Sequence, residues 1–169
     1  MITRTHQSTD TWSEAIYSDC ERYRYALTRI WDDSGKRVMF VMLNPSKANE
    51  VANDPTVERC ERRARALGYG AFRVTNIFAW RDTDPNSMRK AVRPIGPGNE
   101  QTLLEGANWA DDIIAAWGAH GEHRDQGFAI RDLLKKSGRP LYHFGLTKAG
   151  HPRHPLYISY GTQPQLWLG

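Results

Sequence analysis

Segments typical of strands alternate with segments typical of helices along most of this chain, and that alternation limits the folds open to it. Beyond an opening strand, the predicted strands are short apolar runs at 36–43, 71–80, 111–121 and 139–146. The predicted helices lie between them, at 55–68, 99–110 and 127–138. Two strands joined through a helix usually run parallel in one sheet. We therefore expect an α/β fold, a three-layer sandwich with a mainly parallel central sheet.

The opening strand is predicted at 22–31, where aromatic, basic and apolar side chains alternate. The four residues DDSG at 32–35 are a turn signal before the apolar segment 36–43. We therefore expect these two segments to pair as an antiparallel N-terminal hairpin at the edge of the sheet. Asp54 and Pro55 have the residue types of an N-cap and a first helical residue, and Asn99 is expected to cap a second helix.

The composition is typical of a single globular domain, and we expect this domain to span residues 1–169. The longest apolar run, Val38 to Leu43, is far too short to cross a bilayer, and the polar N-terminus lacks the apolar region of a secretion signal. We therefore expect a cytoplasmic protein with no membrane partner. Cys20 and Cys60 form no CxxC pair, so both are expected to be reduced thiols. The 17 arginines and six lysines outnumber 19 acidic residues, which weakly favours a polyanionic partner such as nucleic acid.

Four polar loops follow the predicted strands, at 43–56, 76–85, 116–123 and 145–157. The carboxyl ends of strands in an α/β sheet gather at one edge, where ligands bind. We therefore expect the polar side chains of these loops to converge on one rim. They are Asn44, Asp54, Asn76, Trp80, Arg81, His120, His123, His151 and His154.

Asn44 and Asp54 are the candidates for holding and activating a water. The Asn44 amide can position a water but cannot act as a strong base, whereas Asp54 is the nearest carboxylate that could. Each has a structural alternative, an Asx turn for Asn44 and a helix N-cap for Asp54. An N-cap role and a functional role for Asp54 are compatible.

The segment HPRHPLY at 151–157 contains two histidines in a loop that Pro152 and Pro155 keep from being helical. Together with HGEH at 120–123 it offers four imidazoles, but no spacing that forces a zinc site. The functional alternative is that one histidine, with His154 preferred, donates a hydrogen bond to an anionic group. A surface histidine without any role is the other alternative.

Asn76 and Trp80 lie on the predicted strand at 71–80. A buried Asn needs a partner and could read the edge of a base, while Trp80 could stack on a base or serve as core. The arginines at 59, 62, 63 and 65 alternate with Glu58 and Glu61, which predicts a largely solvated, salt-bridged helix face.

Four segments together resemble a bacterial and phage family catalogued as a domain of unknown function: 43–60, 68–85, 115–118 and 145–157, with the motifs LNPS, NDPT, TN-F and PRHPLY. The resemblance spans about residues 20–160. That family is similar in layout to the uracil-DNA glycosylase superfamily. By resemblance, Asn44 positions the attacking water, Asn76 lies in the base pocket and His154 stabilises the departing base. The chain also resembles anti-phage glycosylases that remove glucosylated hydroxymethylcytosine.

The resemblance implies a glycosylase-like fold and a DNA glycosylase that acts on phage DNA with modified bases, without a cofactor, a metal or a protein partner. The expected catalytic residues are Asn44, Asp54 and His154. The expected base pocket contains Asn76, Trp80 and Ser46, and the expected phosphate contacts are Arg81, Lys47 and Arg153. Two alternatives stay open: a non-catalytic nucleic-acid or nucleotide-binding module, and a hydrolase of nucleosides or sugar phosphates.

Overall fold

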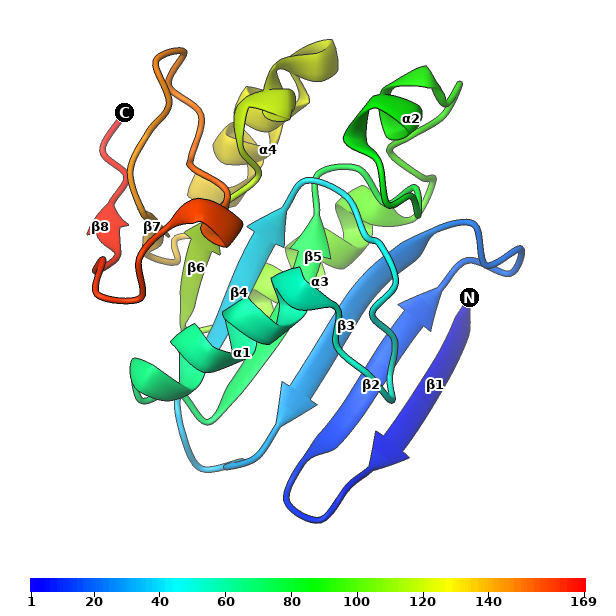
Figure 1. The fold of residues 1–169 in the computed structure, drawn as a ribbon, viewed down its shortest axis with the longest axis vertical. Coiled ribbons are helices and arrows are strands. Elements are labelled where there is room, and N and C mark those ends of the chain that lie inside the picture. Colours follow the sequence, from blue (N-terminus) through cyan, green and yellow to red (C-terminus); the bar gives the residue numbers. More distant parts are fainter.

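The computed structural model describes residues 1–169, whose strands form one eight-stranded sheet in the order β1-β2-β3-β5-β4-β6-β7-β8 (Figure 1). The strands are β1 (Ile2–Gln7), β2 (Trp12–Tyr17), β3 (Arg24–Ile30), β4 (Arg37–Met42), β5 (Ala71–Asn76), β6 (Asp112–Ala115), β7 (Leu141–His143) and β8 (Gln165–Leu166). The helices are α1 (Pro55–Ala66), α2 (Pro85–Lys90), α3 (Asn99–Trp109) and α4 (Gln126–Lys135), with 3-10 helices η1 (Ala119–Asp125) and η2 (Pro155–Tyr157).

The sheet is mixed, so the prediction of a mainly parallel sheet is wrong. The pairs β4-β5, β4-β6 and β6-β7 are parallel, whereas β1-β2, β2-β3, β3-β5 and β7-β8 are antiparallel. Strands β1, β2 and β8 were not predicted from the sequence, and they take part in three of the four antiparallel pairs. The residues of β1 and β8 are mostly polar and partly or fully exposed at the two edges, so they lack the apolar run that predicts a buried strand.

The predicted hairpin between 22–31 and 36–43 is also wrong, because β5 lies between β3 and β4. Leu27 on β3 and Phe40 on β4 both pair with Val74 on β5. Every residue from Val38 to Met42 is at most 2% exposed. A strand so fully buried is stable in the middle of a sheet, with neighbours on both sides and helices on both faces.

The turn after β3 crosses the start of β5 at very short range. The backbone N–H groups of Trp31 and Asp32 both donate to the carbonyl oxygen of Gly70, at 3.0 Å each. A Cβ atom on Gly70 would lie 2.1 Å from the carbonyl oxygen of Asp32. Only a residue without a side chain permits this crossing.

Replacing Gly70 with alanine should therefore lower the free energy of unfolding by about 2–3 kcal/mol, because backbone must move to relieve the overlap. Gly161→Ala is the matched control, since the nearest heavy atom to its Cβ would be the Ser159 Oγ atom at 3.6 Å. Urea unfolding of both variants measures the difference. Equal midpoints for Gly70→Ala and the wild type would contradict the packing described here.

Helices cover both faces of the sheet, which confirms a layered α/β arrangement. One core lies between the sheet and α1, where Phe40 and Phe72 pack with Val57 and Cys60. The other core lies on the opposite face, where α3 and α4 supply residues such as Leu103 and Leu134. In Figure 1, α1 lies in front of the sheet and α3 behind it.

The predicted start of α1 is confirmed. The Asp54 carboxylate accepts a hydrogen bond from the Val57 backbone N–H at 2.9 Å, and Pro55 is the first helical residue. Asn99 does not cap α3: it is the first residue of that helix, and its buried amide donates instead to the carbonyl oxygen of Asn76 at 2.8 Å. None of the helices has the length and apolar character needed to cross a bilayer.

Candidate functional site

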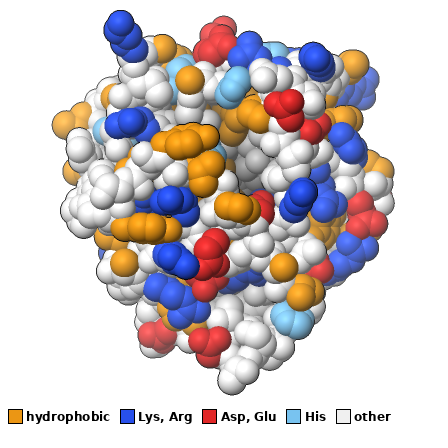
Figure 2. Space-filling view, viewed as in Figure 1, with side chains coloured by type: hydrophobic (Ala, Val, Ile, Leu, Met, Phe, Trp, Pro, Cys, Tyr) orange, Lys and Arg blue, Asp and Glu red, His pale blue; other side chains and the backbone are white.

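A cleft of about 620 Å³ opens beyond the carboxyl ends of β4 and β6. Its lining comes from segments 43–46, 54–56, 82–85, 117–120 and 147–157. Figure 2 shows a hollow near the middle of this face, with hydrophobic and basic side chains around it. Five of the nine residues predicted for the site line this cleft: Asn44, Ser46, Asp54, Arg153 and His154.

Asn44 is held at the rim of the cleft through its amide nitrogen. The Nδ2 atom donates to the carbonyl oxygen of Asp82 at 2.9 Å and more weakly to that of Pro45 at 3.3 Å. The bond to Pro45 is donated by Nδ2, so it is not the Asx turn considered from the sequence, in which the side-chain oxygen accepts from a backbone N–H. The stronger bond joins two loops far apart in sequence. Because Nδ2 is engaged, the Oδ1 atom is the group that Asn44 can offer to a ligand or a water.

Asp54 combines a structural role with a place in the cleft wall. Its Oδ1 atom caps α1, and its Oδ2 atom accepts from the Ala48 backbone N–H at 3.2 Å. The second bond ties the loop 44–54 to the start of the helix. Each carboxylate oxygen retains a further lone pair, so the negative charge of Asp54 can still act on a bound group.

A buried arginine lies beneath this loop. Arg24 is 1% exposed, and its guanidinium donates to the carbonyl oxygen of Ala48 at 2.9 Å. Burial lowers the pKa of Arg24 to about 10, while the negative charge of Asp54 raises it. The Nε atom is buried without a hydrogen-bond partner. Arg24 therefore supports the cleft wall from below and interacts electrostatically with Asp54.

His154 faces the cleft next to Gly118. A Cβ atom on Gly118 would lie 3.3 Å from the Cβ atom of His154, and Gly118 has a φ of +77°, so a side chain there would be strained. The His154 Nδ1 atom accepts from the Leu156 backbone N–H at 3.3 Å, which caps η2. With Nδ1 as acceptor, the proton of the neutral ring is on Nε2, which is then a donor.

Burial lowers the pKa of His154 to about 4, and the nearby Asp54 carboxylate acts in the opposite direction. We therefore predict that His154 stays neutral from pH 8 down to about pH 5. An NMR titration of the imidazole resonances measures this directly, and Asp54→Asn should lower the midpoint of His154 further. A midpoint for His154 near 6.5 would contradict the burial described here.

The same shift implies a sign for stability. The unfolded chain takes up a proton on His154 near pH 6.5, but the folded chain does so only near pH 4. Between these values the unfolded state binds more protons, so this residue makes the fold less stable as the pH falls. In urea titrations at pH 7 and pH 5, the wild type should lose more stability than His154→Asn.

The start of α1 adds donors to the cleft wall. The Thr56 backbone N–H donates no hydrogen bond within the protein, and Thr56 and Pro55 both line the cleft. The partial positive charge of the helix end favours anionic groups here. Arg153 also lines the cleft, is exposed and has no carboxylate within ion-pair distance.

The other four predicted residues are not in the cleft, so the expected convergence on one rim is only partly correct. Asn76 is 2% exposed and its Oδ1 atom is buried without a partner. Lys47 is exposed on the loop after β4. Arg81 donates to the carbonyl oxygen of Glu21 at 3.1 Å and packs on the Tyr17 ring. Asn76 is buried as the last residue of β5, and Arg81 is held by its contacts with Glu21 and Tyr17, so neither side chain reaches the cleft.

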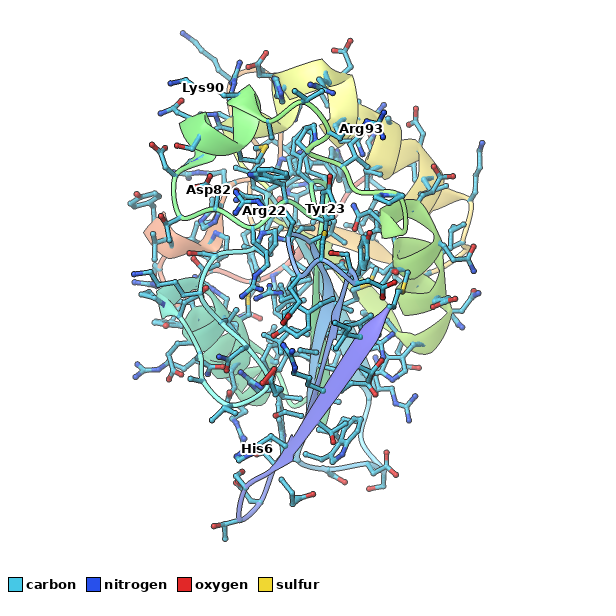
Figure 3. The ribbon with its side chains drawn as sticks, turned by 90° about the vertical axis from the view of Figure 1, so that its right-hand side faces the viewer. His6, Arg22, Tyr23, Asp82, Lys90 and Arg93 are labelled. Atoms are coloured by element: carbon cyan, nitrogen blue, oxygen red, sulfur yellow. The ribbon has the colours of Figure 1, made fainter.

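Trp80 belongs to a separate aromatic cluster. The Arg22 guanidinium lies 3.9 Å from the centre of its ring, and the Tyr23 ring packs edge-on at 5.8 Å. Tyr23 in turn donates to the carbonyl oxygen of Arg93 at 2.7 Å. In Figure 3, Arg22 and Tyr23 lie below the loop that carries Arg93. A role of Trp80 as part of the protein wall, the alternative weighed from the sequence, fits this packing.

Of the other loop histidines, His120 lines the cleft, whereas His151 and His123 do not, and His123 packs against Phe78. His151 is 1% exposed, stacks on Phe128 at 4.4 Å and accepts from the Trp117 indole N–H at 3.2 Å. His154, and not His151, therefore lines the cleft. His120 also lines it and lies 3.2 Å from an Arg89 nitrogen. No three or more His, Cys, Asp or Glu side chains are grouped so as to hold a metal ion.

Asp82, Thr83 and Trp117 also line the cleft and were not among the site residues predicted from the sequence. A signal was present for two of them, since Asp82 and Thr83 lie in a loop that follows a predicted strand. Trp117 is fully buried, yet it contributes to the floor, and only its neighbours in the fold show this.

Comparison with known proteins finds one match. Residues 24–156 match the family model described as "Protein of unknown function (DUF1643)". No curated protein and no solved structure matches the chain. The matched segment begins at β3 and contains every cleft residue except Tyr157.

Proposed function

The chain belongs to the DUF1643 family of proteins of unknown function, and from its cleft we propose that it is a DNA glycosylase. The reaction is hydrolysis of the N-glycosidic bond of a modified base, which leaves an abasic site. The proposed substrate is glucosylated hydroxymethylcytosine in phage DNA, and the proposed role is defence against phage. The observation that carries the proposal is a neutral histidine in one cleft with an Asn and an Asp.

The chemistry of glycosidic cleavage explains why these residue types suit the reaction. The sugar gains oxocarbenium character while the base leaves with negative charge. A hydrogen-bond donor near the leaving base and a negative charge near the sugar both stabilise that transition state. The Nε2–H of His154 is the proposed donor, and a neutral donor is available across the whole physiological pH range.

Water is the nucleophile in this proposal. The free Oδ1 atom of Asn44 accepts a hydrogen bond from the water and orients it toward the sugar carbon. Asp54 stabilises the positive charge that develops on the sugar, and its remaining lone pairs can receive the proton of the water. Arg24 supports this role because it holds the loop between the two residues.

The size and walls of the cleft support a bulky, polar base. Its volume of about 620 Å³ is in the middle of the range of ligand pockets. Ser46, Thr83 and Thr147 supply hydroxyl groups that suit a sugar substituent. An enzyme acting on a base in DNA must draw that nucleotide out of the stack, so an open cleft at the surface is required.

The test is incubation of the purified protein with DNA containing glucosylated hydroxymethylcytosine, with uracil DNA and with unmodified DNA. Alkali then breaks strands at abasic sites. We expect breakage of the modified DNA alone. No breakage of any of these DNAs would overturn the proposal.

A second candidate is a hydrolase of nucleosides or sugar phosphates. The free Thr56 N–H at the start of α1 and the unpaired Arg153 of the same cleft favour it, because both suit a phosphate group. Release of base or phosphate from free nucleosides and sugar phosphates, with no requirement for DNA and little dependence on salt, would support this function instead.

A further inference from the structure

A second hollow of about 580 Å³ adjoins the cleft and is lined by Arg59 and the segment 156–161. We call this surface the shelf. Leu156 and Tyr157 line both the shelf and the cleft, so the two lie side by side. Whatever polymer enters the cleft therefore has the shelf next to it.

The shelf presents the chain's exposed aromatic side chains. Tyr157 is 83% exposed and Tyr160 is 44% exposed, and they are the only aromatics among the eight large hydrophobic side chains that are exposed. The others are Met1, Val51, Val92, Leu146, Leu166 and Leu168. Two exposed aromatic rings three residues apart offer flat faces that can stack with bases.

The backbone of the shelf is held rigidly by a buried arginine of α1. Arg63 is 2% exposed and donates to the carbonyl oxygens of Ile158 at 2.5 Å and Ser159 at 3.3 Å. Its guanidinium lies 4.9 Å from the centre of the Tyr160 ring and 4.7 Å from that of Phe144. The shelf is thus pre-organised, which reduces the entropy lost when a ligand binds.

The charge of the shelf favours an anion. The Arg59 guanidinium lies 5.0 Å from the centre of the Tyr160 ring and has no carboxylate within ion-pair distance. Its neighbours on α1 differ, because Arg62 pairs with Glu58 and Arg65 pairs with Glu61. No residue that lines the shelf is acidic.

We propose that the shelf binds unpaired DNA nucleotides that flank the nucleotide in the cleft, with bases stacked on Tyr157 and Tyr160 and a phosphate on Arg59. This inference rests on the proposed function for its choice of DNA. A base in a duplex has both faces covered by its neighbours, so exposed aromatic faces select unpaired bases. The protein should therefore bind single-stranded DNA more tightly than duplex DNA.

The test is fluorescence anisotropy with an unmodified oligothymidylate of about 12 nucleotides and with a duplex of the same length, over a series of salt concentrations. Tyr157→Ala and Tyr160→Ala should each weaken single-strand binding about 5- to 100-fold without changing its salt dependence. Arg59→Gln should reduce the slope of log K against log salt by about 0.7, because one phosphate contact is lost. Tyr157→Phe should retain binding.

Matched controls remove similar groups elsewhere. Leu168→Ala removes an 88% exposed apolar side chain, and Lys136→Gln removes an exposed charge just after α4, so neither should change binding. Circular dichroism of each variant checks folding. Equal affinity for duplex and single-stranded DNA, or wild-type binding by both tyrosine variants, would overturn the proposal that the shelf binds unpaired nucleotides.

The outcomes separate the shelf from the glycosylase. If the shelf variants lose single-strand binding while the wild type cleaves no DNA, the proposed reaction fails and the shelf stands. If the wild type excises the modified base and the shelf variants do so equally well at low substrate concentration, the reaction stands and the shelf is overturned.

Discussion

Substitution of His154 by asparagine should lower the rate of base release about 100- to 1,000-fold, the loss typical when one donor to a developing negative charge is removed. The variant is chosen because an Asn oxygen can still accept from the Leu156 N–H and so keep the cap of η2. It lacks a donor at the position of Nε2. The rate is measured in single turnovers on DNA with glucosylated hydroxymethylcytosine.

His154→Gln should have the opposite effects to His154→Asn, because it keeps a hydrogen-bond donor and loses the cap of η2. A glutamine amide N–H reaches close to the position of Nε2 but does not cap η2, so we expect more activity and less stability than for asparagine. His6→Ala is the control, because His6 lies at the far end of the molecule from Asp82 (Figure 3). Activity of His154→Asn within threefold of wild type would remove His154 from the mechanism.

Asn44→Ala is expected to have a loss of similar size, at least about 100-fold in the single-turnover rate, because the water is no longer oriented toward the sugar. Oligonucleotide affinity should stay within about twofold, since neither the shelf nor Arg153 is changed. The substitution also removes the hydrogen bond from Asn44 to the Asp82 carbonyl oxygen, which should lower the free energy of unfolding by about 1 kcal/mol. Rate, affinity and urea midpoint are measured on the same preparation.

Asn108→Ala provides the comparison for Asn44→Ala, because Asn108 is an exposed amide on α3 and does not line the cleft. It should match the wild type in rate. If the protein bound DNA without catalysis, neither the wild type nor Asn44→Ala would form any product, and both would still bind DNA. Parallel losses of rate and affinity in Asn44→Ala would contradict the role given to this residue.

Several features of the cleft were predictable because their causes are local. Asp54 and Pro55 predict a helix start from neighbouring residues alone, and the structure has it there. Asn44 follows an apolar strand, so its place at the carboxyl end of β4 also follows from the sequence. Since parallel strands align their carboxyl ends, Asn44 and His154 could be expected in one cleft although they are far apart in the chain.

The arginines of α1 show where local reasoning fails. Their alternation with glutamates predicts a solvated face, and Arg62 and Arg65 do form exposed pairs with Glu58 and Glu61. Arg63 has the same sequence surroundings, yet it is buried and bonds to carbonyl oxygens about 95 residues away. Helical spacing places Arg63 on the buried face of α1, three residues after Cys60, but the carbonyl groups that it bonds come from the segment after η2, which no pattern within the helix shows.

The sequence by itself determined the start of α1, the apolar strands β4, β5 and β6, and the polar loops that follow them, because each depends on residues within a turn or two. Only the tertiary structure decided that β5 separates β3 from β4, that Trp80 packs under Arg22 outside the cleft, and that Arg24 and Arg63 are buried. Strand order and burial depend on which apolar surfaces, distant in the sequence, pack against one another and lose contact with water. The hydrophobic free energy gained in this way belongs to the assembled core and not to any one segment.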